Sequence, residues 1–522
     1  MVTVSDPEVI GEPGPLPEPD ASERHRAFAL LVSVFVIATC GLVYELVAGA
    51  LASYLLGDSI TQFSLVIGCY LSAMGLGSWL SKFVTQNPLR VFIGIEILVG
   101  IIGGCSASIL FLAFGVLPGF KPLLFTLVAI IGTLVGLEIP LLLQLLKGRF
   151  VFRDLVAHVL FLDYAGALLA SLLFPFLLVP KLGLLETAFV FGLANVGVAL
   201  WACRLFAKEL GPRRDLAVAG TLAALLLGAG LASSRELHDL GEAQVYEAKP
   251  IYAIKTPYQR IVVTHEHGDL RLYLSGHLQF SSRDEHRYHE ALVHPLLSLC
   301  PGAKRALVLG GGDGLAVREL LKYDGLEHIQ LVDLDPEMTR IFRDEPILSA
   351  LNRGSLKDPR VTITNADAMR WLLQHDELFD VVIIDLPDPS NYSLGKLYSR
   401  SFYHLVRRHL SEQGGYVVQS TSPYQAPMSF ACIAHTIEDT GVATHPYHCY
   451  VPSFGEWGFV LGLKRSRKVP APLKPGLPRR YLDDATLRGL FVFPADMQIR
   501  ETEINTLNSQ ALVSYYNNEW QP

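Results

Sequence analysis

The chain has 522 residues, a length that accommodates roughly three domains of about 150 residues each. Half of its residues are hydrophobic and only 18% are charged, against about 25% in a typical soluble domain, and the apolar excess falls in the first half. The net charge of −7 excludes a broad basic surface for nucleic acid. Its seven cysteines have no C-x-x-C pair and no matched histidines, which argues against a disulfide framework and a structural zinc site.

The N-terminal half has the pattern of a membrane domain. Residues 1–26 are rich in Pro, Glu and Asp, so we expect a disordered tail that buries no core. Over residues 27–233 we expect a helical domain with six to seven spans in a lipid bilayer, since most apolar stretches reach the roughly 20 residues that a crossing needs. The stretches are 27–51, 61–81, 91–116, 122–146, 155–179, 184–203 and 216–232.

The loop charges predict an orientation for these spans. Alternate loops carry nearly all of the Lys and Arg residues, and the basic side of a membrane protein is normally cytoplasmic, so we expect a cytoplasmic N-terminus in a multi-pass inner-membrane protein. Seven full crossings would then put the second half outside, away from a cytosolic nucleotide-like ligand. The seventh stretch is the shortest, so we expect that it or one other segment falls short of a full crossing.

Five acidic residues lie within the predicted spans. Intramembrane acids are costly and face a bundle interior or a wet cavity. In one interpretation they make hydrogen bonds between helices or lie near the membrane interface. In the other they line a polar chamber for a lipid head group or a cation, a role for which Glu138 and Asp163 are best suited because they lie deepest. The five are Glu45, Glu96, Glu138, Asp163 and Glu186.

The second half has the pattern of a soluble α/β protein. The segment RIVVTHEHGDLRLYLSG predicts a hairpin that turns at Gly268, within a small β-rich subdomain and entry helix over 234–300. Strand and helix patterns alternate over 301–464, which predicts a doubly wound, Rossmann-like parallel sheet. Residues 465–522 are assigned to a C-terminal tail that starts Pro-rich and basic and ends in a short helix.

A glycine-rich turn opens this α/β region in the segment LVLGGGDGLAVREL. The first strand ends at Leu309, the chain turns through Gly310, Gly311 and Gly312, and a helix begins shortly after. Glycines at such a turn allow close approach of a ligand to the backbone. Asp313 would repel a pyrophosphate, so the turn is suited to a cationic ligand such as a sulfonium or an ammonium group.

Acids also follow the next three strands. The LVDLD segment places Asp333 about 20 residues after the glycine turn, where an acid takes two ribose hydroxyls. The segment TNADAM places Asp367 within reach of an exocyclic adenine amine, and VVIIDLPDPSN places Asp385 at a strand end with Asp388 three residues later. Ligands of such sheets bind at the carboxyl ends of the strands, so these acids predict one common site.

The pattern GGGDG…VDLD…NADA…DLPDP resembles the polyamine aminopropyltransferases, the spermidine synthase family. LYLSGHLQFSSRDEHRYHEALVHPLL resembles the signature segment of that family and TPYQRIVV its entry strand, over residues 245–465 in all. The fusion to a multi-span first half resembles its membrane-bound bacterial branch. The resemblance implies a fold similar to S-adenosylmethionine-dependent methyltransferases. It also implies transfer of an aminopropyl group from decarboxylated S-adenosylmethionine to an amine such as putrescine, which releases methylthioadenosine without a metal.

The resemblance also implies roles on the donor side. Gln259 and Asp313 would contact the aminopropyl and sulfonium end, next to the glycine turn of 310–312. Asp333 would hold the ribose and Asp367 the adenine. The histidines between 265 and 294 lack an acid or cysteine that would complete a ligand set, so no metal is expected there.

On the acceptor side, the resemblance implies that Asp385 takes or orients the proton of the attacking amine, because a protonated amine cannot act as a nucleophile. Tyr258 and Tyr288 would line the reacting centre. The residues implied for acceptor binding are His289, Asp388 and Gln419. A homodimer is a further expectation.

The chain departs from the pattern of the soluble members at the acceptor pocket. Leu386 and Pro387 stand between the two acids, Val451 replaces a tyrosine ahead of a proline, and Phe454 and Trp457 add bulk. An alternative is therefore a transferase that moves an aminocarboxypropyl or methyl group from S-adenosylmethionine to a membrane lipid head group. A transporter or sensor that binds its ligand without turnover is a third interpretation, which the retention of both acids disfavours.

Overall fold

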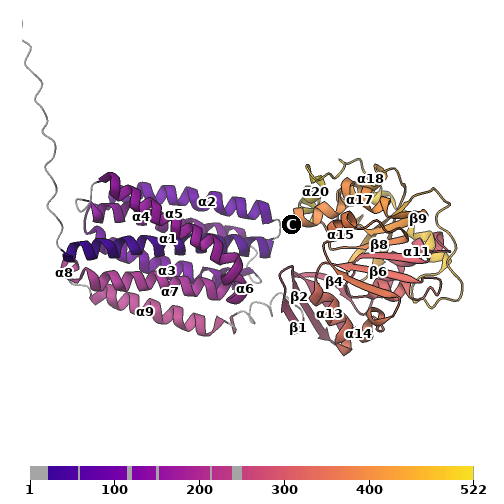
Figure 1. The fold of residues 1–522 in the computed structure, drawn as a ribbon, viewed down its shortest axis with the longest axis horizontal. Helices are drawn as coiled ribbons and strands as arrows, with labels where there is room; N and C mark the ends of the chain where they lie inside the picture. The colour runs from indigo at the N-terminus through magenta and orange to yellow at the C-terminus, as the bar shows by residue number, and fades with distance from the viewer. Residues whose placement is uncertain are drawn as a thin grey trace, which may run out of the picture. The chain divides into compact units, whose positions relative to one another are not determined.

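The computed structural model describes residues 21–56, 59–114, 120–147, 152–211, 214–234, 236–237, 248 and 250–520. The chain divides into two compact units, a helical unit within the first 241 residues and an α/β unit from Glu242 onward. The two units are labelled in Figure 1, and each is described by itself.

The helical unit is a bundle in which α3 packs against α4, α7 and α9. Within the described residues, seven segments of this unit are long and apolar enough to cross a membrane, and the seventh stretch of the sequence meets this criterion as α9. A π-helical turn over Phe174–Leu178 joins α5 to α6 within one apolar segment. The helices are α1 (Ala21–Leu56), α2 (Ser59–Leu80), α3 (Pro88–Phe114), α4 (Phe120–Leu146), α5 (Phe152–Leu173), α6 (Val179–Lys181), α7 (Leu184–Leu205), α8 (Ala207–Leu210) and α9 (Arg214–Ala232).

The first helix begins earlier than the sequence pattern indicates. Helix α1 starts at Ala21, so the expectation of disorder up to residue 26 is wrong for its last six residues. The run ASERHR contains no proline and no glycine, and it extends the apolar helix that follows it. Residues 1–20 lie outside the part of the chain that the structure describes.

Two of the acids in the spans are fully buried between helices. Glu96 on α3 is 0% exposed and Glu138 on α4 is 1% exposed. Asn195 on α7 donates a hydrogen bond to Glu96 at 3.2 Å, so this acid joins two helices. One oxygen of each carboxyl group has no partner among the described residues. Glu186 lies in the first turn of α7, near a helix end rather than deep in a span.

The α/β unit begins with a four-stranded antiparallel sheet in the order β1-β2-β3-β4. The predicted hairpin is confirmed: β2 pairs with β3, and His267 and Gly268 turn the chain with φ values of 49° and 76°. Positive φ at both central residues matches the twist of the flanking strands. The strands are β1 (Pro250–Lys255), β2 (Arg260–Glu266), β3 (Asp269–Leu274) and β4 (His277–Ser281).

The main sheet has seven strands in the order β10-β11-β9-β8-β5-β6-β7. The predicted doubly wound parallel sheet is confirmed for β5 to β9, and β11 adds antiparallel to β9 and β10. The chain order reverses between β5 and β8, which is where ligands bind in such sheets. The strands are β5 (Arg305–Gly310), β6 (His328–Asp333), β7 (Val361–Asn365), β8 (Phe379–Asp385), β9 (Leu410–Gln419), β10 (Ala443–Val451) and β11 (Gly455–Leu463).

Helices cover both faces of this sheet and form two cores. Along β5, Ala306 and Val308 point into one core, whereas Leu307 and Leu309 point into the other, as alternation along a strand requires. The first core includes α11, α12 and α13, and the second includes α15, α17, α18 and α20. The helices are α11 (Glu285–Leu299), α12 (Leu315–Leu320), α13 (Pro336–Asp344), α14 (Pro346–Leu351), α15 (Ala368–Gln374), α16 (Tyr392–Gly395), α17 (Arg400–Arg408), α18 (Pro427–Glu438), α19 (Asp484–Leu490) and α20 (Ala511–Trp520).

The segment after Lys464 packs against the α/β unit rather than extending from it. Leu473 and Leu487 belong to the first core, and α20 packs against α18. The buried carboxylate of Glu290 on α11 accepts three backbone N–H groups of residues 480–482. The sequence assigns this segment to a tail, but its apolar side chains are part of the folded unit.

Candidate active site

The glycine turn after β5 brings the backbone against two strand-end acids. Gly310 and Gly311 have φ values of 80° and 63°, a conformation that side chains rarely allow. A Cβ atom at Gly310 would lie 2.1 Å from the carbonyl oxygen of Asp385, and one at Gly312 would lie 2.6 Å from Asp333 Oδ2. The three glycines are therefore needed where the ends of β5, β6 and β8 come close together.

Two acids predicted for the donor side are fixed by backbone N–H groups. Asp333 accepts a hydrogen bond from Gly312 N–H at 3.0 Å on one oxygen and from Asp335 N–H at 2.9 Å on the other. Asp313 accepts from Leu315 N–H at 2.8 Å at the start of α12. Burial raises the pKa of each of these two carboxyl groups to about 6. An incoming cation would offset that burial and favour their ionised form.

The predicted donor-side residues on the β1–β2 turn have different positions. Gln259 donates to Asp335 Oδ2 at 3.2 Å, and Thr256 donates to the same oxygen at 2.7 Å, so the turn is tied to the acid that caps α13. Gln259 is therefore linked to Asp333 only through Asp335, whose N–H donates to Asp333. Tyr258 is 53% exposed, so its side chain is not packed into the cluster of acids.

Asp367 lies at the end of the third parallel strand and caps α15. One of its oxygens accepts from Arg370 N–H at 2.9 Å, and the other makes an ion pair with Lys396 at 2.6 Å. Burial acts to raise the pKa of Asp367, but Lys396 and the helix backbone outweigh it and lower the pKa. Nothing in the sequence pattern indicated Lys396 as a partner. Contact with an adenine amine stays a prediction for this residue.

Asp385 is the acid in the centre of the site, at the end of β8. The hydroxyl of the buried Tyr288 donates to Asp385 Oδ1 at 2.6 Å. A Cβ atom at Gly311 would lie 3.1 Å from Asp385 Oδ2, so the second oxygen faces the glycine turn. Burial raises the pKa of Asp385, and the nearby His289 and Tyr288 oppose that effect.

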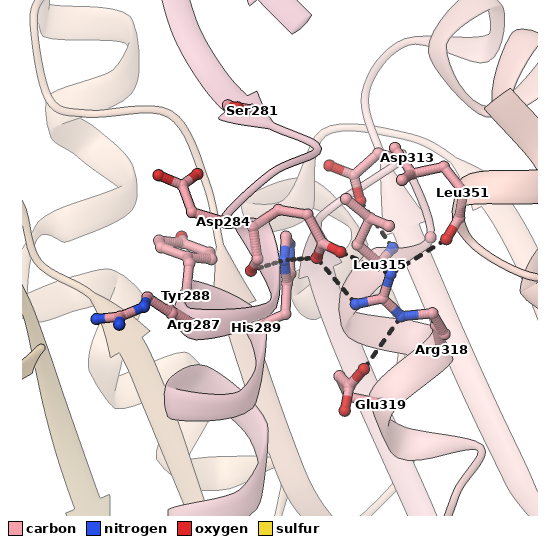
Figure 2. A network of polar contacts seen from close by, with 12 residues as sticks. Ser281, Asp284, Arg287, Tyr288, His289, Asp313, Leu315, Arg318, Glu319 and Leu351 are labelled. Carbon is pink, nitrogen blue, oxygen red and sulfur yellow. Dashed lines mark hydrogen bonds and ion pairs between the residues drawn. The ribbon is translucent and has the colours of Figure 1, made fainter. Parts of the chain in front are cut away.

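A buried ionic network supports the site from behind. Nδ1 of His289 on α11 lies 2.9 Å from Glu285 Oε2, and Arg318 on α12 donates two hydrogen bonds to Glu285 at 2.9 and 2.8 Å (Figure 2). Arg318 also donates to Glu319 at 3.0 Å. Burial alone would lower the pKa of His289, but Glu285 and the site acids outweigh it and raise the pKa to about 9. At neutral pH the site therefore contains an imidazolium beside Asp313 and Asp385.

Of the residues predicted for the acceptor side, Gln419 contacts Asp388, three residues after Asp385, whereas His289 pairs with Glu285. Gln419 at the end of β9 donates to Asp388 Oδ1 at 3.2 Å and to the hydroxyl of Tyr398 at 2.6 Å. Trp457 on β11 donates to Gln419 Oε1 at 3.3 Å, which fixes the orientation of the amide. Burial raises the pKa of Asp388 to about 6, although its hydrogen bonds act in the opposite direction.

Other residues of the site were missed from the sequence. Tyr516 on α20 and Thr421 after β9 both hydrogen-bond to Asp388. Glu285 and His289 are four residues apart on one helix face, a spacing that could have indicated their pairing. No local pattern indicated Tyr516, because it comes from the far end of the chain.

The glycine turn before Asp313 thus brings the predicted strand-end acids together. Gly312 N–H donates to Asp333 at 3.0 Å, and a Cβ atom at Gly311 would lie 3.1 Å from Asp385 Oδ2. Among the described residues, no group of three or more His, Cys, Asp or Glu side chains is placed to hold a metal ion. A sheet edge with several buried or partly buried carboxyl groups, one imidazolium and a glycine turn can bind a cationic nucleoside. It can also take a proton from an amine held at Asp385.

Comparisons with known proteins agree with this geometry. Residues 285–471 match the family model described as a spermine/spermidine synthase domain. The chain is 51% identical over 520 residues to a polyamine aminopropyltransferase of Ralstonia nicotianae, covering 97% of this chain and 99% of that protein. It is 50% identical to a polyamine aminopropyltransferase of Leptospira interrogans, covering 94% and 98% of the two chains.

Among solved structures, a spermidine synthase in complex with the transition state analogue AdoDATO matches with a TM-score of 0.45 and 26% identity. The match covers 47% of this chain and 86% of that one. The full-length relatives carry the assignment, because they extend over both units at about half identity. The chain therefore belongs to the polyamine aminopropyltransferase family, enzymes that transfer an aminopropyl group from decarboxylated S-adenosylmethionine.

Proposed function

We propose that this chain is a membrane-bound aminopropyltransferase whose acceptor is a diamine such as putrescine, and that methylthioadenosine is released. The observation that carries the proposal is the partly buried Asp385, which accepts a hydrogen bond from the Tyr288 hydroxyl at 2.6 Å and faces the glycine turn. In the reaction, the amine nitrogen attacks the aminopropyl carbon next to sulfur. A C–N bond forms, the C–S bond breaks with its electron pair going to sulfur, and the amine proton goes to Asp385.

On the donor side, Asp313 would lie against the sulfonium end and Asp333 would accept the ribose hydroxyls. Both have one or two backbone donors that fix their orientation, and each keeps lone pairs for a ligand. Carboxylates close to a sulfonium stabilise it by about 1–4 kcal/mol each, depending on exposure. Gln259 would approach the same end through its contact with Asp335.

On the acceptor side, two acids three residues apart would take the two nitrogens of a diamine. Asp385 would hold the reacting amine and Asp388 the distal ammonium, with Gln419 fixing Asp388. His289 would lower the pKa of Asp385 through its positive charge, so that the carboxylate is available as a base near neutral pH. Holding both reactants in line contributes roughly 7–11 kcal/mol in well-oriented systems.

The helical unit would hold the enzyme in the inner membrane. Many of its outward side chains are large and apolar, as a lipid-facing surface requires. Among those exposed are Leu65, Leu71, Phe161, Leu168, Phe176, Leu222 and Leu225. We place the α/β unit in the cytoplasm, together with a cytoplasmic N-terminus, which requires that one of the seven helices does not cross fully. A homodimer stays a prediction.

Reporter fusions test this topology. Green fluorescent protein and alkaline phosphatase would each be fused after residue 522. A cytoplasmic α/β unit gives fluorescence without phosphatase activity, whereas phosphatase activity without fluorescence would contradict it.

The alternative lipid-modifying transferase needs a partner for the donor carboxylate. Arg318 lies on the helix after the glycine turn, but Glu285 and Glu319 already engage its guanidinium group. This arrangement favours the decarboxylated donor, which has no carboxylate to be bound.

Product analysis by mass spectrometry tests the proposal. The detergent-solubilised full chain would be incubated with each donor, and with either putrescine or a lipid extract. We expect methylthioadenosine and spermidine only from the decarboxylated donor with the diamine. An alkylated lipid formed from intact S-adenosylmethionine would contradict the proposal, and Asp385→Asn serves as the inactive control.

A further inference from the structure

The last helix of the chain forms part of the acceptor side of the site. Tyr516 on α20 is 8% exposed, and its hydroxyl hydrogen-bonds to Asp388. The two residues are 128 positions apart in the sequence. Buried polar groups nearly always have a hydrogen-bond partner, and the partly buried Asp388 is the partner of this buried phenol.

The position of α20 is fixed by two anchors. The carboxylate of Glu519 accepts from Met428 N–H at 2.7 Å and from Ser429 N–H at 3.0 Å, the first residues of α18. Asn505, which is fully buried, donates to the carbonyl oxygen of Tyr398 at 3.1 Å. These contacts tie the segment from Asn505 to Trp520 to the same elements that surround Asp388.

The backbone next to the acceptor side is strained. Thr421 has a φ of 53°, an unfavourable conformation for a β-branched residue, and such residues occur where the surroundings hold them in place. Gly458 N–H donates to its carbonyl oxygen at 2.6 Å, and the Trp520 indole N–H on α20 donates to its hydroxyl at 3.2 Å. The Thr421 side chain is thereby held so that it also hydrogen-bonds to Asp388.

We propose that Tyr516 is a specificity-determining residue of the acceptor site, which fixes Asp388 as the anchor for the distal ammonium group of a diamine. The inference rests on the proposed function and extends it to one side chain at the end of the chain. Tyr516 acts through Asp388 and does not take part in the proton transfer at Asp385.

The pH dependence of KM distinguishes this role from a purely structural one, because Asp388 titrates near neutrality. The titratable groups that face Asp388 are Tyr516, Tyr398 and Tyr288, and burial holds the pKa of each phenol above its ordinary value. Asp388 is thus the group of this cluster that titrates near neutrality, with a pKa raised to about 6 by burial. Loss of the Tyr516 donor raises that pKa further, so the anchor becomes neutral at a higher pH.

Steady-state kinetics of Tyr516→Phe in the full chain test the proposal, with putrescine and the one-nitrogen analogue butylamine as acceptors. We expect the KM for putrescine to rise about tenfold at pH 7, because a hydrogen bond to a charged group is lost, and to rise more at pH 6. The kcat, the donor KM and the KM for butylamine are expected to stay within about twofold of wild type.

Two matched variants sharpen the test. Tyr515→Phe removes the neighbouring hydroxyl of the same helix, which contacts Glu503 N–H instead, and is expected to behave as wild type. In the Asp388→Asn background, Tyr516→Phe is expected to add nothing further to the KM, since the two side chains act as one unit.

An unchanged KM and pH profile in Tyr516→Phe would overturn the inference, and so would an equal effect of Tyr515→Phe. Both results leave the proposed function standing if the wild-type chain converts putrescine. A wild-type chain that converts no diamine would overturn the proposed function and this inference with it.

Discussion

The two units both bury carboxyl groups, but they surround them differently. In the helical unit, Glu96 accepts from Asn195 and hydrogen-bonds with Glu138, and one oxygen of each of these two acids has no partner among the described residues. In the α/β unit, Asp385 and Asp388 receive donors from tyrosine and glutamine side chains. The acids of the second unit therefore have side-chain donors beside a glycine turn, whereas those of the first bond to one another and to a neighbouring helix.

The difference shows what makes a buried acid a site for a cationic substrate. Donors fix the carboxylate, a glycine turn leaves room for a ligand beside it, and the imidazolium of His289 partly balances the negative charge. Burial without these features favours a neutral carboxyl group that bonds to a neighbouring helix. The following changes should affect the two units to very different extents.

Replacement of Asp385 by Asn should have the largest effect. Without the carboxylate, no group in hydrogen-bond reach takes the amine proton, and general base catalysis contributes about 10²–10⁴-fold. We expect kcat to fall about 10³-fold while donor affinity stays nearly unchanged. Turnover assays together with equilibrium dialysis of the donor measure the two effects, and survival of turnover would rule out Asp385 as the base.

Replacement of Glu285 by Gln should break the buried network behind the site. Arg318 and His289 would lose a charged partner, and breaking a buried ion pair costs about 3–5 kcal/mol. We expect a fall of several degrees in the thermal unfolding midpoint of the full chain in detergent. The exposed pair of Glu337 and Arg340 provides the control, since Glu337→Gln should leave the midpoint almost unchanged. Equal midpoints for the two variants would argue against a structural role of the network.

The pH profile of activity should have an acidic limb set by Asp313 and Asp388 and a basic limb set by His289. Asp313 and Asp388 have pKa values raised to about 6, so they lose their charge, and with it their hold on cationic substrates, as the pH falls through 6. Below that value we expect kcat/KM to fall about tenfold per pH unit for each carboxylate that must be ionised, and so up to about a hundredfold where both are required. His289 has a pKa raised to about 9 and loses its positive charge above it, so activity should also fall there. Glu285→Gln should move this upper limb to lower pH, because Glu285 raises the pKa of His289.

Replacement of Glu138 by Gln in the helical unit should have the smallest effect. Every contact described for the site comes from residues 250–520, so the kinetic constants should stay within about twofold of wild type. A loss of transfer activity in the folded variant would instead assign this acid a part in the reaction.

Much of the site could be predicted from local patterns, because strand ends in a doubly wound sheet meet at one edge. The positions of Asp333 and Asp385 follow from the strand pattern and the sheet topology alone. Partners that lie on distant segments of the chain cannot be predicted from the sequence pattern around the acid. Lys396 pairs with Asp367 from the segment after β8, and Tyr516 reaches Asp388 from the last helix.

The departures from the family pattern were visible in the sequence, but their consequence was not. Val451, where the resemblance leads one to expect a tyrosine, is fully buried in β10. The phenol of Tyr516, in a segment that the sequence assigned to a tail, contacts Asp388. The hairpin of β10 and β11 was likewise not predicted, since its aromatic residues follow no strict alternation.

The most direct test of the site is the affinity of the full chain for decarboxylated S-adenosylmethionine compared with its neutral thioether counterpart, decarboxylated S-adenosylhomocysteine. The two ligands differ by one methyl group and one positive charge on sulfur. If Asp313 and its neighbours recognise that charge, the sulfonium should bind about tenfold more tightly at pH 8, and the preference should shrink by pH 5 as the carboxyl groups protonate. Equal affinities at pH 8 would contradict a site in which carboxylates bind the cationic donor.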